Sequence, residues 1–366
     1  MITVHAGHDP TLPGSLATLY PDRWIRRLAL AGVLLCFGVV VLGAYVRLTA
    51  AGLGCPDWPG CYGHVTPLGA EESVAAQAAF PTRPLDVGKA WREMTHRYAA
   101  STLGLIIVAI ATVAIVARRT GPVRIPYALA LLGLVVFQGL LGMLTVTWQL
   151  KPLIVTGHLV FGLTTLGLLW WLWLSLPADR VGPEPSVTPV PSQRSAATRA
   201  ALPLAAIGLV ALALQIALGG WTSSNYAAIA CPDFPTCQNA WWPHADFRNA
   251  FVLWRGLAIN FEGGVLNQPA RVAIHLMHRL GALMATLTLC LAAGVTLWGR
   301  IPRRARQAAV AVLIALALQL TIGISMVLRG FPLWLATAHT GGAAVLLLSV
   351  LALLRSLSGA AAPRSF

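Results

Sequence analysis

The chain has 366 residues, of which 57% are hydrophobic and only 10% are charged, and its formal net charge is +14. This composition excludes an ordinary soluble domain and predicts an integral membrane protein. The basic charge does not indicate a nucleic-acid partner, because its placement follows a membrane topology. With the N-terminus in the cytoplasm, 15 Lys and Arg residues fall in predicted cytoplasmic segments and eight in predicted outer segments.

Eight apolar runs are long enough to cross a bilayer, each near the roughly 20 residues that ~30 Å of hydrocarbon requires. They fall at about 28–49, 98–117, 126–148, 153–176, 201–222, 273–298, 307–328 and 332–354. The first run is too long for a cleaved signal peptide and lacks the cleavage signature, so we expect it to remain. The sequence therefore predicts an all-α integral membrane fold with eight transmembrane helices.

The order of these runs predicts two halves joined by a linker, with both ends of the chain in the cytoplasm. The predicted parts are a tail (1–22), an N-terminal four-helix bundle (23–176) with an outer loop (50–91), a linker rich in Pro, Ser and Arg (177–199), a C-terminal four-helix bundle (200–355) with an outer loop (223–270), and a tail (356–366). The linker composition is typical of a domain boundary.

The second half repeats the first at nearly constant offsets. The recurring features are a cysteine pair (176 residues apart), His96 and His278 (182), Gln138 and Gln319 (181), and His158 and His339 (181). Such spacing indicates an internal duplication. Because each half has an even number of crossings, both halves keep the same orientation. We therefore expect two four-helix bundles related by a pseudo-two-fold axis along the membrane normal.

The repeated histidines carry the strongest chemical signal. Each half places two imidazoles near the outer ends of its even-numbered spans, His96 with His158 and His278 with His339. Polar groups in a membrane interior are costly, and two imidazoles facing each other across a bundle are the usual way to hold haem iron. The alternatives are histidines hydrogen-bonded within the bundle, or a zinc or copper site, for which a dense Cys/His cluster is missing. We expect each pair to face one another with room for a macrocycle between them.

Each outer loop contains the motif Cys-Pro-Asp-aromatic-Pro-x-Cys, with Cys55 and Cys61 in the first loop and Cys231 and Cys237 in the second. Disulfides persist on the outer face of a membrane, and five intervening residues with two prolines can close a small loop. We therefore interpret Cys55–Cys61 and Cys231–Cys237 as structural disulfides. A redox-active thiol pair that receives electrons is the alternative, and the spacing leaves it open.

The two halves differ three residues before the first histidine, where the first half has Glu93 and the second has His275. Residues i and i+3 share a helix face, so Glu93 and His96 point at the same object. A carboxylate in a membrane is costly unless it has a function, which makes Glu93 the candidate catalytic residue. The alternative is a structural ion pair with Arg92 or Arg97. On the functional interpretation, one half holds a resident haem and the other a haem that is chemically changed.

The Glu-x-x-His-Arg motif, the paired cysteine loops and the histidines on the even-numbered spans together resemble the haem A synthase family. The resemblance covers the chain from about residue 24 to 355. It implies an enzyme, an oxidoreductase that oxidises the C8 methyl group of haem O to a formyl group and so supplies haem A to terminal oxidases. It also implies a bacterial inner-membrane location.

The resemblance further implies a role for each site residue. In such enzymes the C-terminal half holds a permanent haem b, which assigns His278 and His339 as its axial ligands. The N-terminal half receives haem O, which assigns His96 and His158 to the substrate and Glu93 to catalysis.

Several further expectations accompany this assignment. His275, Arg97 and Arg279 are secondary candidates at the two sites. The four-electron oxidation proceeds through two hydroxylations and loss of water, and Glu93 either stabilises positive charge at the methyl carbon or accepts a proton. The expected partners are membrane lipid, haem O, haem O synthase and an unidentified electron donor, and a homo-oligomer is left open.

The alternative function is a di-haem b-type electron-transfer cytochrome that reduces quinone or ferric iron. To carry electrons across the membrane it needs one haem near each face, whereas all four candidate ligands lie toward the outer side. A haem-delivery protein is a third hypothesis. Glu93 discriminates among them, because a passive electron carrier has no clear use for an acid at that position.

Overall fold

The computed structural model describes residues 16–117, 124–176, 196–299 and 301–358. Most of the predicted tail 1–22 and linker 177–199, and the end of the tail 356–366, lie outside these residues. The long helices are α1 (Leu16–Leu48), α4 (Val87–Val116), α5 (Arg124–Thr147), α6 (Pro152–Ser175), α7 (Ala196–Ser224), α9 (Gln268–Trp298), α10 (Arg303–Leu328) and α11 (Leu333–Ser358). All eight contain a window apolar and long enough to cross a membrane, which confirms the predicted all-α fold with eight candidate spans.

The outer ends of the spans begin with recognisable helix signals. Asp86 caps α4, and its carboxylate accepts a hydrogen bond from the Lys89 N–H at 3.0 Å. Asn267 caps α9 in the same way through the Ala270 N–H at 3.1 Å. Pro152 begins α6, where its missing N–H costs nothing. These caps start α4 and α9 before the apolar runs predicted at 98–117 and 273–298, so the Glu93 and His275 motifs lie within helices.

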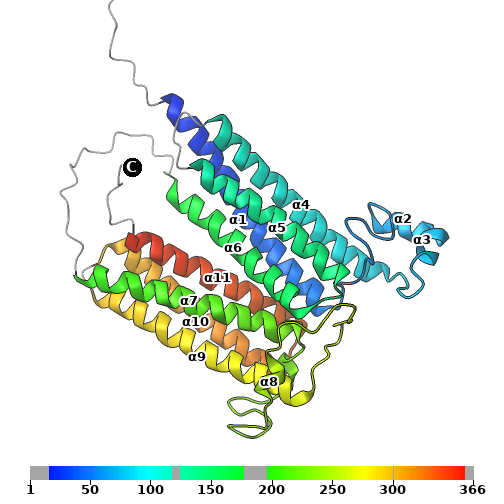
Figure 1. The fold of residues 1–366 in the computed structure, drawn as a ribbon. Coiled ribbons are helices and arrows are strands. Elements are labelled where there is room, and N and C mark those ends of the chain that lie inside the picture. Colours follow the sequence, from blue (N-terminus) through cyan, green and yellow to red (C-terminus); the bar gives the residue numbers. More distant parts are fainter. Residues whose placement is uncertain (1–15, 118–123, 177–195, 300, 359–366) are drawn as a thin grey trace, which may run out of the picture.

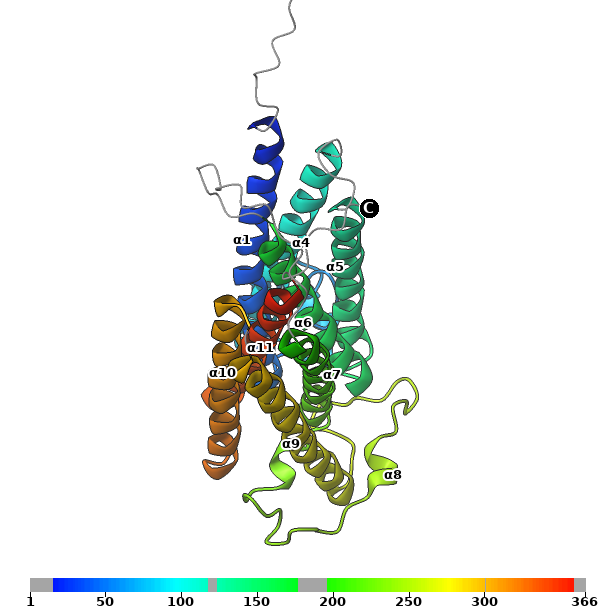
Figure 2. The ribbon, with the colours of Figure 1, turned by 90° about the vertical axis from the view of Figure 1, so that its left-hand side faces the viewer.

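The helices of each half share one pattern of neighbours. In the first half α1 and α5 each pack against α4 and α6, and in the second half α7 and α10 each pack against α9 and α11. The halves meet where α6 contacts α7 and where α11 contacts α1 and α6 (Figures 1 and 2). This recurrence is what the predicted duplication implies. The pseudo-two-fold axis and the domain limits at 23–176 and 200–355 stay predictions.

Small and polar residues hold the two halves together. A Cβ added at Gly220 of α7 would lie 3.2 Å from Thr156 of α6, so glycine lets these helices approach closely. Beside it, the hydroxyls of Thr156 and Ser224 lie 3.3 Å apart. Further along, the Trp170 Nε1–H donates to the Leu348 carbonyl at 3.0 Å. One buried apolar cluster runs through both halves, so the two bundles share a continuous core.

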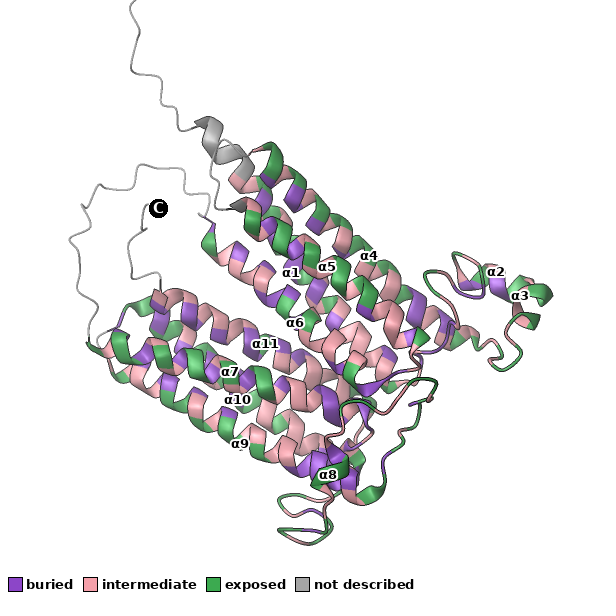
Figure 3. Cartoon of the chain, in the orientation of Figure 1, coloured by how far each residue is buried: buried purple, intermediate pink, exposed green. Residues whose placement is uncertain are grey.

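The outward faces of the helices expose large apolar side chains, as lipid-facing surfaces do. Leu34 on α1 and Leu105 on α4 are 66% and 70% exposed, and Leu214 on α7 and Leu287 on α9 are also exposed. Exposed residues recur along the outside of both halves in Figure 3. Apolar patches of this extent are tolerated where lipid is the solvent. The chain is therefore a multi-pass membrane protein.

Both outer loops lie at the same end of the bundles, and they contain short helices that we did not predict (Figure 1). These are α2 (Pro67–Glu72), α3 (Val74–Ala78), a 3₁₀ turn at Ala228–Ala230, and α8 (Phe247–Ala250). The second loop also reaches the first half. The Lys151 ammonium lies 3.5 Å from the centroid of the Trp254 ring, and the Phe261 N–H donates to the Gln149 carbonyl at 3.0 Å.

Candidate functional site

The four repeated histidines form two pairs of nearly identical geometry. The ring centroids of His96 on α4 and His158 on α6 are 6.5 Å apart, with an angle of 77° between the ring planes. The rings of His278 on α9 and His339 on α11 are also 6.5 Å apart, at 72°. The structure thus confirms that each predicted pair faces one another. Both pairs lie toward the end of the bundles that carries the outer loops.

A glycine on an odd-numbered span faces each of these histidines. The distances that an added Cβ would have from the histidine Cε1 atom are 2.9 Å for Gly43 and His96, 3.5 Å for Gly142 and His158, 3.3 Å for Gly219 and His278, and 2.9 Å for Gly323 and His339. The separations of 2.9 Å at Gly43 and Gly323 are shorter than real Cβ contacts, so a side chain at either position would force the imidazole to shift. These glycines form notches in α1, α5, α7 and α10 into which the edges of the imidazoles fit.

Partly buried glutamines contact three of the four histidines. Gln138, Gln215 and Gln319 each donate an amide N–H to the backbone carbonyl of a histidine at 3.0 Å, respectively that of His158, His278 and His339. Amide nitrogens of the second and third glutamines also approach the imidazole rings, at 3.1 Å and 3.3 Å. Glutamines therefore tie the histidine-bearing helices to their neighbours at the depth of the rings.

The paired rings have the spacing that one metal ion between them requires. A metal–imidazole bond is roughly 2 Å long and the nitrogen lies roughly 1 Å from the ring centroid, so two opposed ligands have centroids roughly 6 Å apart. The Nδ1 atoms of His96, His158 and His339 are buried without a hydrogen-bond partner in the described part of the chain. All four side chains nevertheless keep some accessible surface. This donor set fits the iron of a haem held between two helices.

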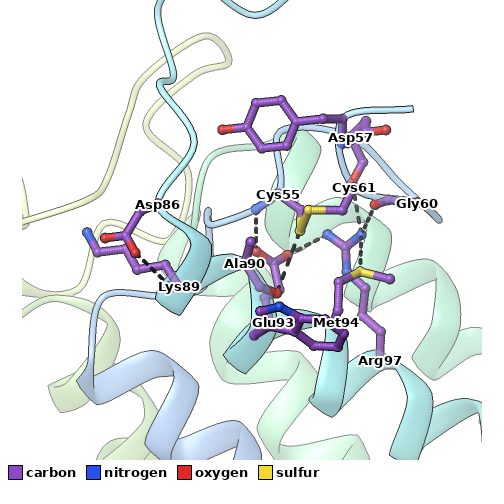
Figure 4. Close-up of a disulfide and its surroundings, with 12 residues drawn as sticks. Cys55, Asp57, Gly60, Cys61, Asp86, Lys89, Ala90, Glu93, Met94 and Arg97 are labelled. Atoms are coloured by element: carbon purple, nitrogen blue, oxygen red, sulfur yellow. Dashed lines mark hydrogen bonds and ion pairs between the residues drawn. A yellow bond between two sulfur atoms is a disulfide. The ribbon is translucent and has the colours of Figure 1, made fainter. Parts of the chain in front are cut away.

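Glu93 lies beside the first histidine pair in sequence, but its carboxylate is turned to the first outer loop (Figure 4). The side chain is buried, with only 5% of its surface exposed. Its Oε2 accepts a hydrogen bond from the Cys55 N–H at 2.8 Å, and its Oε1 forms an ion pair with Arg97 one turn later on α4. A buried carboxylate needs such partners. Of the two arginines considered from the sequence, Arg97 makes the ion pair.

The Arg97 guanidinium also holds the cysteine loop against α4 (Figure 4). Its Nη1 donates to the carbonyls of Asp57 at 3.0 Å and Gly60 at 2.5 Å. Because Arg97 directly follows His96, the loop is fastened at the level of the first histidine pair. Gly54 allows this approach, since a Cβ there would lie 2.6 Å from the backbone of Lys89.

The aspartate of each cysteine motif folds the turn that follows. The Asp57 carboxylate accepts hydrogen bonds from the N–H groups of Tyr62 at 2.6 Å and Gly63 at 2.7 Å. Both of these residues have positive φ, which a two-residue hairpin turn requires. Asp233 repeats the arrangement and also accepts the Thr236 hydroxyl at 2.5 Å. This hydrogen bond is the main reason why the pKa of Asp233 is lowered.

The second half keeps the arginine clamp but not the carboxylate. Arg279 donates to the carbonyls of Asp233 and Thr236, both at 2.7 Å, as Arg97 does in the first loop. In place of Glu93, the buried His275 ring has its Nδ1 3.2 Å from the Ala227 carbonyl. An acceptor in the first half is thus replaced by a donor in the second. Both halves thus have the arginine contacts to the cysteine loop, but only the first half has a carboxylate next to them.

The cysteine pairs form the expected bonds. Disulfides join Cys55 to Cys61 and Cys231 to Cys237, and all four sulfur-bearing residues are buried. Each disulfide closes the loop that the arginine of its own half clamps.

Comparison with known proteins decides the family. Residues 26–351 match the family model described as cytochrome oxidase assembly protein. A haem A synthase of Shewanella oneidensis is 40% identical over 328 residues, which cover 89% of this chain and 94% of the relative. The chain belongs to the haem A synthase family. More distant members include those of Rhizorhabdus wittichii, 28% identical over 353 residues (90% and 93% covered), and Granulibacter bethesdensis, 27% identical over 348 residues (89% and 86% covered).

Within this family framework, the structure brings the predicted residues together in two groups. The histidine pairs lie between helices, while Glu93, Arg97 and Arg279 contact the cysteine loops. Two surface hollows, one between the ends of α9 and α10 and one beside Lys151, are lined by other residues. The macrocycle cavity and the roles of the site residues stay predictions.

Sequence reasoning missed the glycine notches and Gln215. Gly43 and Gly219 lie 176 residues apart and Gly142 and Gly323 lie 181 apart, the same offsets as the cysteines and the second histidines. That repetition was a usable signal. Gln215 gave no such signal, because the first half has valine at the corresponding position.

Proposed function

We propose that this chain is a haem A synthase that oxidises the C8 methyl group of haem O to a formyl group while binding a haem b. The observation that carries the proposal is a duplicated pair of imidazoles with one difference beside it. Both histidine pairs have centroids 6.5 Å apart, but only the first half places a buried carboxylate, Glu93, three residues before its first histidine. The 40% identity to a haem A synthase along 89% of the chain supports the same conclusion.

The proposed division of labour follows this difference. His278 and His339 are assigned to the iron of haem b, and His96 and His158 to the iron of the substrate haem O. The half that changes its haem is the half with the acid. Haem b, when bound, supplies the iron redox chemistry that the oxidation needs.

The chain itself positions the substrate and controls charge beside it. His96 and His158 would hold the substrate iron between α4 and α6. Glu93 is proposed as the catalytic carboxylate that stabilises positive charge at the methyl carbon or accepts its proton at Oε2. The ion pair with Arg97 and the hydrogen bond from Cys55 hold that carboxylate at a fixed place below the loop.

The proposal is tested by extracting and chromatographing the haems of the purified protein. Wild type is compared with Glu93→Gln, which keeps the shape and removes the charge, and with Glu262→Gln, an exposed acid of the second loop. We expect wild type and Glu262→Gln to contain haem b together with haem O, a hydroxylated intermediate or haem A. Glu93→Gln is expected to retain haem O and to accumulate no product.

Two equivalents of haem b in all three proteins, without haem O or its products, would overturn the proposal. That result is what the di-haem electron-transfer cytochrome predicts. The positions of the histidines favour the synthase, because both pairs lie toward the same end of the bundles. A carrier that moves electrons across the membrane needs haems near opposite faces.

The proposed setting is a bacterial inner membrane with both termini in the cytoplasm, as the distribution of Lys and Arg predicts. Both disulfides are then on the oxidising side. Haem O synthase and a separate electron donor are the proposed partners. Labelling of single cysteines introduced at the termini with an impermeant thiol reagent tests the orientation, and labelling of intact cells would contradict it.

A further inference from the structure

A surface hollow opens between α9 and α10, at the end of the second bundle that lies away from the outer loops (Figure 1). Its volume is about 550 Å³, which is within the range of sites that hold small organic ligands. The residues that line it are Leu297, Ile301, Arg303, Arg306, Gln307 and Val310. The hollow thus combines three apolar side chains with two guanidinium groups and one amide, and none of these residues belongs to the histidine pairs or the cysteine loops.

This hollow lies where the helices leave the apolar interior of the membrane. Because α10 has 26 residues, it is roughly 39 Å long, which exceeds the ~30 Å of hydrocarbon in a bilayer. The apolar run of α10 begins at about residue 307, so Arg303 and Arg306 lie at the depth of the lipid headgroups. Trp298, the last residue of α9, is 92% exposed, and tryptophan is enriched at this boundary.

The positive charge of the hollow is not neutralised by the helices around it. The four long helices of the second half, α7, α9, α10 and α11, contain no Asp or Glu. Arg303 and Arg306 lie three residues apart and so share one face of α10. In the described residues, neither guanidinium has a hydrogen bond or an ion pair. Neighbouring like charges repel, so an anion bound between them stabilises this end of the bundle.

We propose that the hollow binds an anionic phospholipid. Its phosphate lies between the guanidinium groups of Arg303 and Arg306, whose planar donor groups match phosphate oxygens, and the Gln307 amide donates a further hydrogen bond. An acyl chain follows the three apolar side chains toward the hydrocarbon. Basic pockets between transmembrane helices bind anionic headgroups in this way. The site lies at the opposite end of the bundle from the histidine pairs and does not depend on the proposed function.

Native mass spectrometry of the purified full-length protein, released from detergent micelles, tests this proposal. The protein is titrated with phosphatidylglycerol, with phosphatidylcholine of the same acyl chains, and with inorganic phosphate, and the dissociation constant of each bound species is measured. We expect one phosphatidylglycerol to bind more tightly than phosphatidylcholine. Inorganic phosphate, which has no acyl chain, is expected not to displace the lipid.

Substitutions within the first two turns of α10 separate the hollow from the general charge of the helix end. Each arginine contributes about fivefold to the binding of anionic lipid, so Arg303→Gln combined with Arg306→Gln should weaken phosphatidylglycerol binding about 25-fold. Arg304→Gln is the matched control, because Arg304 is exposed on the same turn but does not line the hollow, and its dissociation constant should equal that of wild type. Gln307→Glu places a negative charge in the hollow and should also weaken binding, which provides the answer if the double variant does not fold.

Equal phosphatidylglycerol binding by wild type and by the variants of the hollow would overturn the proposal. An equal loss in Arg304→Gln would also overturn it, because the charge of the helix end and not the hollow would then attract the lipid. Displacement of the lipid by inorganic phosphate would show a site for free phosphate, and equal affinity for the two lipids would show that the arginines do not select an anion. Either result contradicts a site for anionic lipid. None of these measurements depends on the haem content, so a failure of the proposed function would leave them unchanged.

Discussion

Replacing Gly43 by alanine tests whether the glycine notch sets the position of His96. The new Cβ would lie 2.9 Å from His96 Cε1, whereas non-bonded carbon atoms pack best at about 3.5 Å. One of the two groups must therefore move by about 0.6 Å. Because α1 and α4 pack against each other, we expect the ring to move rather than the helices. A functional site tolerates displacements of only about 0.5 Å.

Gly142→Ala is the matched control on the other side of the same pair. Its Cβ would lie 3.5 Å from His158 Cε1, which is an ordinary contact. We expect Gly43→Ala to lose haem O and haem A to apomyoglobin about tenfold faster than wild type, and Gly142→Ala to behave as wild type. Overpacking should cost Gly43→Ala about 1–3 kcal/mol of unfolding free energy, measured by thermal unfolding in detergent. Equal haem release from the two variants would refute the argument that this notch positions the ring.

Three further predictions concern the second outer loop. Replacing Cys231 and Cys237 by serine should lower the free energy of unfolding by about 2 kcal/mol, since a cross-link of sequence separation 6 is lost; thermal unfolding measures this. Arg279→Met removes the donor to the loop carbonyls and should speed hydrogen exchange in the loop. The pKa of Asp233 is lowered chiefly by the hydrogen bond from the Thr236 hydroxyl. The ionised carboxylate therefore contributes its full stabilisation to the loop above about pH 4, the pKa of an unperturbed aspartate. That stabilisation is lost as the pH falls through the lowered pKa. Thr236→Val should move that loss of exchange protection to higher pH.

Each of these predictions has an outcome that contradicts it. Unfolding that is the same in wild type and in the double serine variant would show that the second disulfide adds no stability. The exposed Arg329 supplies the control for Arg279, and equal loop exchange in Arg279→Met and Arg329→Met would contradict the clamp. Identical pH profiles for wild type and Thr236→Val would show that the hydroxyl does not control Asp233.

Hydropathy located the membrane crossings but not the ends of the helices. The run predicted at 98–117 belongs to α4, which begins at Val87 because Asp86 caps it there. The polar turns between the cap and the apolar run are helical without being apolar, so a hydropathy scan does not detect them. The short helices in the outer loops were not predicted for the same reason. They are started by local caps such as Asp246 and have no long apolar pattern.

The partners of Glu93 show where sequence reasoning reached its limit. Arg97 was one of two candidates for an ion pair because it lies one helical turn away. The Cys55 N–H was not foreseeable, because it reaches Glu93 only after the first loop folds back over α4. Contacts within a helix follow from spacing, whereas contacts between a loop and a helix depend on tertiary packing.

The repeat identified candidate site residues where the two halves have the same residue, and it identified none where the halves differ. Gln138 and Gln319 were recognised because they occupy equivalent positions in the two halves. Gln215 was overlooked because Val39 is an ordinary residue in an apolar span. Its contact with His278 depends on the packing of α7 against α9, where Gly281 makes room for the amide.

The contacts of α6 with α7 and of α1 with α11 join two divergent halves within one polypeptide. Were the halves encoded by separate genes, each would compete to associate with further copies of itself, and some assemblies would contain two copies of Glu93 and others none. Because both belong to one chain, each half meets the other at a high effective concentration. Each chain therefore contains one copy of Glu93 and one copy of His275, so the ratio of the two halves is fixed at one to one when the chain is translated.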